Sequence, residues 1–225
     1  LRAKMAEIGA DLGLAHDGDA DRVLFVDASG NEVDGDRVLA ICATDMASRG
    51  ELANNEVVST VMCNLGFVRA MGENGIEVAQ TAVGDRFVLQ RMLVDGAVIG
   101  GEQSGHIIFL NHNTTGDGLV TALQLMAVMK RTGKSLAELA RVMRRFPQSL
   151  VNVRTARKDE HGSNTAVAAA VETEAEALGD AGRVLVRASG TEPLVRVMVE
   201  ASTEELATDC AERIAAVIRA ELDGE

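Results

Sequence analysis

The segment from Asp17 to Arg22, Asp-Gly-Asp-Ala-Asp-Arg, places three carboxylates on alternate positions with only small residues between them. In an extended loop alternate residues point the same way, so the three carboxylates converge and repel one another. A hard divalent cation relieves this repulsion, and Mg²⁺ takes oxygen ligands of this kind. Arg22 adds a planar cation suited to a phosphate beside the metal. The sequence therefore predicts a Mg²⁺ site at Asp17, Asp19 and Asp21, with Arg22 in a catalytic role.

An ordinary Asp-rich turn is the alternative for this segment, because Asx-turns account for one or two such residues. An EF-hand is excluded, since its twelfth position would be Ala28 rather than a glutamate. Residues 10–15 and 23–26 both read as strands, so the loop is expected to join two strand ends, a rigid place for chemistry.

A second polar segment, Gly-Glu-Gln-Ser-Gly-His at residues 101–106, follows a predicted strand. Glu102 can accept hydrogen bonds from vicinal sugar hydroxyls, and Ser104 can donate or accept them. The two glycines allow a ring to approach the backbone closely. A polar turn is the alternative, and His106 could orient the loop rather than contact a ligand.

A third segment, Arg-Ala-Ser-Gly-Thr-Glu-Pro at residues 187–193, lies between two predicted strands. Successive N–H groups around Gly190 can form an anion-binding nest, to which Ser189 and Thr191 add hydroxyls. Arg187 supplies a bidentate, charge-assisted contact, so the segment can hold a phosphate without hydrolysing it. A glycine-containing hairpin connection is the alternative. Arg196 is a weaker candidate, because it can simply lie on the solvated face of the sheet.

In this order along the chain, the three segments resemble the metal-binding, sugar-binding and phosphate-binding loops of the α-D-phosphohexomutase superfamily. The resemblance covers essentially the whole chain. Gln103, together with Val-Gly-Asp-Arg at residues 83–86, looks most like the bacterial phosphoglucosamine mutase branch. The resemblance also places Arg86 near the sugar, which implies a binding role for it with Glu102, Ser104 and His106.

The resemblance implies an isomerase that interconverts glucosamine 6-phosphate and glucosamine 1-phosphate through a phosphoserine and a bisphosphorylated sugar. The family's Ser-x-Ser-His-Asn motif for that serine is absent from these 225 residues. We therefore expect it in an N-terminal half of the same protein, preceding Leu1, and expect this chain alone to be inactive. The alternatives are a phosphomannomutase or phosphoglucomutase, or a non-catalytic sugar-phosphate-binding fragment.

The amino-acid composition argues against several classes of binding partner. Asp and Glu outnumber Lys and Arg by 34 to 22, and Trp and Tyr are absent, so the chain lacks both the basic surface and the stacking platforms of nucleic-acid binders. There is no long apolar run and no signal-peptide pattern, so we expect a cytoplasmic protein without membrane contact. Cys42, Cys63 and Cys210 lie far apart and predict buried thiols rather than a zinc site or disulfide.

The spacing of apolar residues predicts alternating strands and helices up to about residue 146, followed by a change of pattern. We expect an α/β domain with a mixed, largely parallel sheet and then a small two-layer α+β domain of order β-α-β-β-α. The predicted divisions are a remnant of the family's second domain with the metal loop, a sugar-binding domain and a phosphate-binding domain, at residues 1–33, 34–147 and 148–225.

For two helices the sequence also predicts a buried face or an N-terminal cap. In the helix at 117–131, Leu119, Leu123, Met126 and Met129 share one stripe, and Asp117 is expected to cap the N-terminus. In the last helix, from about residue 203 to 222, Ser202 and Glu205 are expected to form a capping box.

Overall fold

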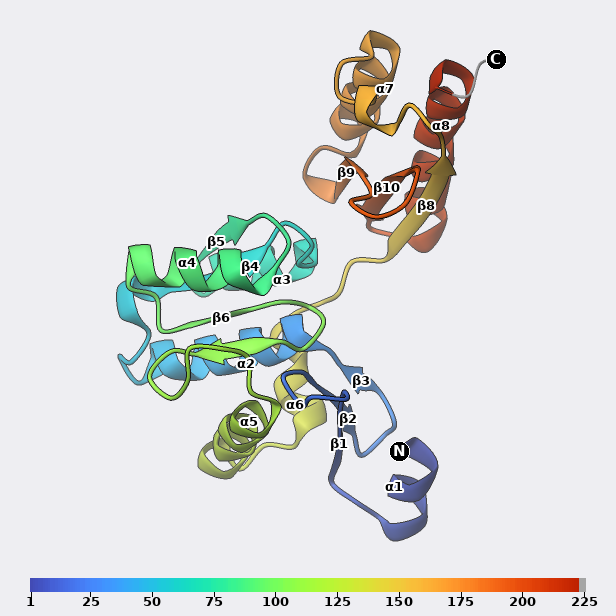
Figure 1. Ribbon diagram of the computed structural model, residues 1–225. Helices are drawn as coiled ribbons and strands as arrows, with labels where there is room; N and C mark the ends of the chain where they lie inside the picture. Colours follow the sequence, from blue (N-terminus) through green and yellow to red (C-terminus); the bar gives the residue numbers. More distant parts are fainter. Residues whose placement is uncertain (223–225) are drawn as a thin grey trace. The chain divides into compact units, whose positions relative to one another are not determined.

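The computed structural model describes residues 1–222, and the chain divides into two compact units, residues 1–144 and 145–225 (Figure 1). Each unit is described by itself. No helix within residues 1–222 combines the length and the apolar character needed to cross a bilayer.

The first unit opens with helix α1 (Arg2–Ile8) and a three-stranded antiparallel sheet. Its strands, in spatial order, are β1 (Leu12–His16), β2 (Val23–Asp27) and β3 (Glu32–Val33). Strands β1 and β2 pair from Leu12 opposite Asp27 to His16 opposite Val23. The predicted strand–loop–strand arrangement is therefore confirmed, and residues 17–22 form the connection at one end of the β1–β2 ladder.

The rest of this unit is an α/β fold. Its sheet has the order β5-β4-β6-β7, with β4 parallel to both β5 and β6 and with β7 antiparallel to β6. The predicted mixed, largely parallel sheet is confirmed. In chain order the elements are α2 (Gly35–Ser48), β4 (Glu56–Thr60), α3 (Leu65–Glu73), β5 (Glu77–Thr81), α4 (Asp85–Asp95), β6 (Ile99–Gly101), β7 (Ile107–Phe109), α5 (Gly118–Thr132) and α6 (Leu136–Leu139).

One hydrophobic core spans both sheets of the first unit. Phe25 and Val33 from the antiparallel strands belong to the same buried cluster as Leu39 of α2, Phe67 of α3 and Ile99 of β6. Residues 1–33 and 34–144 therefore pack as one unit here. The division of the chain into three domains stays a prediction.

The predicted apolar stripe of α5 is wrong for two of its four residues, while Met126 and Met129 are partly buried against the core. Leu119 and Leu123 have exposed fractions of 61% and 56%, whereas Ala122, Leu125 and Val128 are buried. The helix is apolar around most of its circumference, so periodicity alone could not select the buried face. The predicted cap is confirmed, since the Asp117 side chain accepts the N–H groups of residues 119 and 120.

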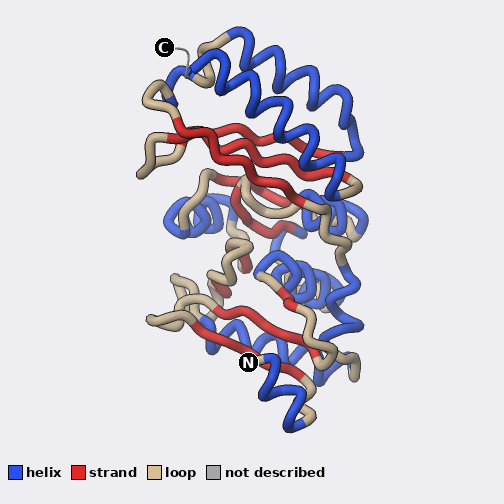
Figure 2. The backbone as a smooth tube through the Cα atoms, turned by 90° about the vertical axis from the view of Figure 1, so that its right-hand side faces the viewer, coloured by secondary structure: helices blue, strands red, loops and turns tan. Residues whose placement is uncertain are grey.

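The second unit has the predicted β-α-β-β-α order. Its elements are β8 (Gln148–Arg154), α7 (Thr165–Leu178), β9 (Gly182–Ala188), β10 (Leu194–Ala201) and α8 (Glu204–Leu222). The sheet has the order β8-β10-β9 and is antiparallel throughout. Figure 2 shows α7 and α8 lying together over one face of this sheet, where Val195, Val197 and Ile214 are fully buried.

The cap of α8 lies one residue later than predicted. The N–H of Leu206 donates to the Thr203 hydroxyl oxygen, 3.2 Å away, and the helix begins at Glu204. Ser202 therefore does not form the expected capping box with Glu205. Strand β10 continues to Ala201, and the two following residues are needed to turn the chain into the helix.

Candidate functional site

The carboxylates of the Asp17–Asp21 loop lie together as the sequence predicts. Asp17, Asp19 and Asp21 each offer an oxygen, and these oxygens lie within 4.8 Å of one another. Asp21 Oδ1 is buried and has no hydrogen-bond partner among residues 1–222. Burial, reinforced by Asp17 and Asp19, raises the pKa of Asp21. The loop thus concentrates negative charge around an oxygen that lacks a partner.

This donor set fits Mg²⁺ or another hard divalent cation. Such an ion would give the buried Asp21 oxygen a ligand bond and would offset the repulsion between the three carboxylates. Arg22 lies beside the loop, with Nε 3.8 Å from Asp17 Oδ2 and its backbone N–H 3.3 Å from Asp17 Oδ1. Its side chain is about half exposed, at 52%, so the guanidinium remains accessible to an anion.

The fold brings the predicted sugar loop against the metal loop. The N–H of Val23 donates to the carbonyl of Gly105 at 3.2 Å, and Arg22 forms a β-bridge with His106. Nε2 of the buried His106 lies 3.7 Å from Asp21 Oδ2 and accepts the N–H of Gly116 at 3.2 Å. His106 therefore links three segments, while its buried Nδ1 has no hydrogen-bond partner among residues 1–222, and its contact with a sugar stays a prediction.

The sugar loop also rests on the N-terminus of α2. The Gly35 N–H donates to the Gln103 carbonyl at 3.1 Å, and the Gln103 side-chain amide donates to Asp36 Oδ2 at 3.1 Å. Asp36 is fully buried and also accepts the N–H of Asn64 at 2.7 Å. Asp36 lies outside the three segments that the sequence predicts as site loops, so sequence reasoning missed this support.

Of the remaining predicted sugar ligands, Glu102 and Ser104 belong to this loop and Arg86 to the first turn of α4. Glu102 Oε1 accepts the Gly84 N–H at 3.1 Å, which joins the loop to the start of α4. Arg86 and Ser104 are exposed, and the Arg86 guanidinium lies 4.5 Å from the centre of the Phe87 ring. Glu102 keeps its second carboxylate oxygen for a ligand.

Two glycines next to the Asp117 cap make the close packing possible. A Cβ at Gly116 would lie 2.4 Å from the His106 ring, and one at Gly118 would lie 2.4 Å from His16 Nδ1. The Gly118 N–H donates to the carbonyl of Ala20 in the metal loop at 2.9 Å. In the sequence, only the two glycines that flank Asp117 indicate that another segment packs closely against this cap.

The predicted phosphate loop lies in the second unit, between β9 and β10. Arg187 is directly opposite Arg196 in the ladder, and burial, followed by the Arg196 charge, lowers the pKa of Arg187. Within residues 1–222, the N–H groups of Gly190 and Thr191 have no hydrogen-bond partner. The buried Ser189 hydroxyl accepts the Glu192 N–H at 3.3 Å and keeps its own proton to donate. The loop therefore offers several donors and a partly desolvated cation.

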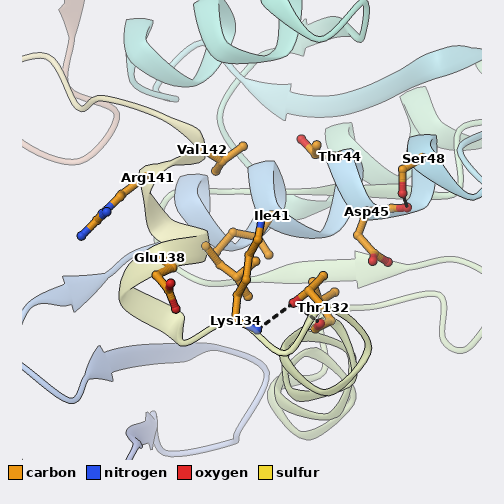
Figure 3. A pocket seen from close by; sticks show the side chains of 11 residues that line it. Ile41, Thr44, Asp45, Ser48, Thr132, Lys134, Glu138, Arg141 and Val142 are labelled. Atoms are coloured by element: carbon orange, nitrogen blue, oxygen red, sulfur yellow. Dashed lines mark hydrogen bonds between the residues drawn. The ribbon is translucent and has the colours of Figure 1, made fainter.

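A separate hollow of about 400 Å³ lies between α2, α5 and α6 in the first unit (Figure 3). Ile41, Val128 and Leu139 form its apolar part, while Asp45 and Lys134 contribute opposite charges. It contains none of the predicted site residues. The candidate site of the first unit is therefore formed by the metal and sugar loops, and the phosphate loop is a separate candidate in the second unit.

Comparison with known proteins identifies the family of the chain. The family model described as phosphoglucomutase/phosphomannomutase, alpha/beta/alpha domain III, matches residues 34–146. The model for the C-terminal domain of the same family matches residues 150–217.

Curated relatives and solved structures extend the match over the whole chain. A phosphoglucosamine mutase of Frankia alni is 58% identical over 99% of this chain and 49% of its own length, and one of Bacillus subtilis is 55% identical over 99% and 50%. The chain thus spans about half the length of these relatives. The crystal structure of Aspergillus fumigatus N-acetylphosphoglucosamine mutase in complex with GlcNAc-6P and magnesium has a TM-score of 0.79 at 22% identity, covering 97% of this chain and 52% of that one. The chain belongs to the phosphoglucomutase/phosphomannomutase family of the α-D-phosphohexomutase superfamily.

Proposed function

We propose that this chain supplies the metal, sugar and phosphate loops of a phosphoglucosamine mutase, which interconverts glucosamine 6-phosphate and glucosamine 1-phosphate for amino-sugar synthesis. A phosphoserine-bearing N-terminal half of the same protein is the proposed partner, and the cytoplasm the proposed location. The observation that carries the proposal is a direct hydrogen bond between the metal hairpin, which consists of β1, the metal loop and β2, and the sugar loop. In it the Val23 N–H donates to the Gly105 carbonyl. The relatives at 55–58% identity support the amino sugar as substrate.

In this proposal Asp17, Asp19 and Asp21 hold Mg²⁺, which when bound neutralises charge on the transferring phosphoryl group. Arg22 binds the same phosphate from beside the loop. Positioning is the chain's other contribution, since a well-oriented reactant avoids much of the entropic cost of the reaction.

The sugar loop and the phosphate loop have separate proposed roles. Glu102 accepts hydrogen bonds from vicinal hydroxyls, with Ser104 and Arg86 as further contacts and His106 as the support beneath them. The phosphate that is not reacting binds at Arg187, at the Ser189 and Thr191 hydroxyls and at the free N–H groups of Gly190 and Thr191.

A phosphomannomutase or phosphoglucomutase is the second candidate, because the family model covers those enzymes too. Fold and chemistry would be unchanged, and only the selectivity for the sugar would differ. Rates of the full-length protein on glucosamine, glucose and mannose phosphates separate the two. A preference for glucose or mannose phosphate would replace the first proposal.

Removal of one carboxylate tests the metal site. Asp19→Ala should raise the Kd for Mg²⁺ by about tenfold or more, because the site loses one of three charged ligands. Isothermal calorimetry on the 225-residue chain measures this. The exposed Asp11→Ala variant has the same change of charge and should bind like the parent chain. Equal affinities of the Asp19 variant and the parent would remove this loop from the metal site.

The metal site should also depend on pH. The pKa of Asp21 is raised in the loop, so protons compete with the cation over the pH range just above the usual range of aspartate. Mg²⁺ affinity is therefore expected to fall as the solution is acidified, and the same titrations repeated at lower pH measure this. An affinity that does not change on acidification would contradict the assignment of Asp21 as a ligand.

Removal of one guanidinium tests the phosphate loop. Arg187→Ala should weaken the binding of inorganic phosphate by about 1.5–3 kcal/mol, the usual contribution of a hydrogen bond to a charged group. NMR titration of the amide resonances locates the site, and Lys130→Ala, at an exposed position on α5 of the first unit, is the control for net charge. Phosphate-induced shifts that lie elsewhere on the unit would count against this loop.

A further inference from the structure

The ammonium group of Lys158 reaches the phosphate loop from a distant part of the chain. Its Nζ lies 2.5 Å from the carbonyl oxygen of Ser189 and 3.3 Å from that of Glu192. Lys158 is half-buried and opens a short 3-10 turn after β8, 31 residues before Ser189. One cation therefore holds both ends of the loop 189–192.

The backbone beneath Lys158 is itself held in place. The Thr155 N–H donates to the Pro193 carbonyl at 3.0 Å, and the buried Thr155 hydroxyl donates to the Leu222 carbonyl at 2.9 Å. Nδ1 of His161 donates to the Lys158 carbonyl at 2.7 Å. Because these contacts restrain the backbone of the segment, only the side-chain torsions of Lys158 remain to be ordered when the ammonium group binds the loop.

The direction of the Ser189 carbonyl decides where the next backbone donor of the loop points. In a planar trans peptide the C=O and the following N–H point in opposite directions. Since the Ser189 carbonyl is turned towards Lys158, the Gly190 N–H is turned away from it. Gly190 and Thr191 are the two loop residues whose N–H groups have no partner within the described residues.

The geometry points to Lys158 as a positioning residue of the anion-binding loop. By drawing the Ser189 carbonyl to one side, it keeps the Gly190 N–H on the other side directed at the anion, and it adds positive charge behind that donor. The contact with the Glu192 carbonyl, which precedes Pro193 and so opposes no N–H, anchors the other end of the loop. This inference rests on the proposed phosphate-binding role of residues 187–191. It assigns the orientation of the loop to a residue outside that motif.

Binding of inorganic phosphate to the 225-residue chain tests this, with the amide resonances followed by NMR. Lys158→Met keeps the length of the side chain and removes its charge and donors, and should weaken binding about tenfold. Lys134→Met in the first unit has the same change of net charge and should leave the affinity unchanged. Lys158→Arg, which can still donate to both carbonyls, should restore most of the lost affinity.

The free chain supplies an independent readout. Without phosphate, Lys158→Met should shift the amide resonances of Gly190 and Thr191 and should leave those of the α7 helix in place. Should the methionine variant fail to fold, Lys158→Gln replaces it with the same expected direction.

The outcomes separate the inference from the function on which it rests. If the parent chain shows no phosphate-induced shifts at residues 187–191, the proposed phosphate site fails, and the inference fails with it. If the parent binds there and Lys158→Met binds equally well, the positioning role is overturned while the site stands. Equal losses in the Lys158 and Lys134 variants, or no recovery in Lys158→Arg, would also overturn it.

Discussion

The 225-residue chain alone is expected to show no mutase activity at any Mg²⁺ concentration. Phosphoryl transfer by the family mechanism needs a side chain that is phosphorylated and regenerated. None of the serines here lies in the family's nucleophile motif, and the three cysteines are buried. The assay adds the purified chain to glucosamine 6-phosphate, Mg²⁺ and a bisphosphorylated sugar, and follows formation of the 1-phosphate.

A full-length family member serves as the positive control of the assay. Trace contamination is the main confounder, so any turnover must survive repurification and scale with the concentration of the chain. Turnover that meets both conditions would show that the missing serine is dispensable. The mechanism proposed above would then have to be abandoned.

Gly105→Ala is expected to destabilise the first unit by about 3 kcal/mol. The residue has φ of +92°, and an added Cβ would lie 2.3 Å from the backbone oxygen of Val23. Neither backbone can move freely, because the Val23 N–H donates to the Gly105 carbonyl. Calorimetry should show the transition of this unit about 10 °C lower. Binding of Mg²⁺ should weaken as well, since the metal hairpin rests on this contact.

Gly18→Ala provides the matched control in the metal loop. Nothing lies within 4 Å of a Cβ at that position, and its φ is not in the left-handed region. Its effect on the transition should therefore be small. If the two variants unfold at the same temperature, the close packing of the sugar loop on the metal hairpin is not a source of stability.

The features that the sequence determined are those encoded within a few neighbouring residues. The three carboxylates of the metal loop lie within five positions, and the turn between β1 and β2 suffices to bring them together. The donors of the phosphate loop are likewise consecutive, at residues 187–191. Cap residues such as Asp117 act on N–H groups two and three residues away, so their positions could also be predicted.

The capping of α8 and the buried face of α5 mark the limit of local reasoning. Ser202 and Thr203 are both suitable N-cap residues for α8. Because β10 continues to Ala201, the helix starts late enough for Thr203 to be the residue that caps it. On α5, apolar residues recur with the helical period of about 3.6 residues on more than one face of the helix. The face that became buried is the one that packs against α2 and β7, and neither partner is visible in the helix's own sequence.

The assembly of the site was decided only by tertiary structure. Gly105 meets Val23 across some eighty residues, Gln103 reaches Asp36, and Lys158 holds a loop 31 residues away. Such contacts form when distant segments share one core, and their energies depend on distances that no local pattern encodes. The sequence alone determined which chemistry each loop can perform. Packing decided that the metal and sugar loops lie side by side, with His106 beneath them as their link.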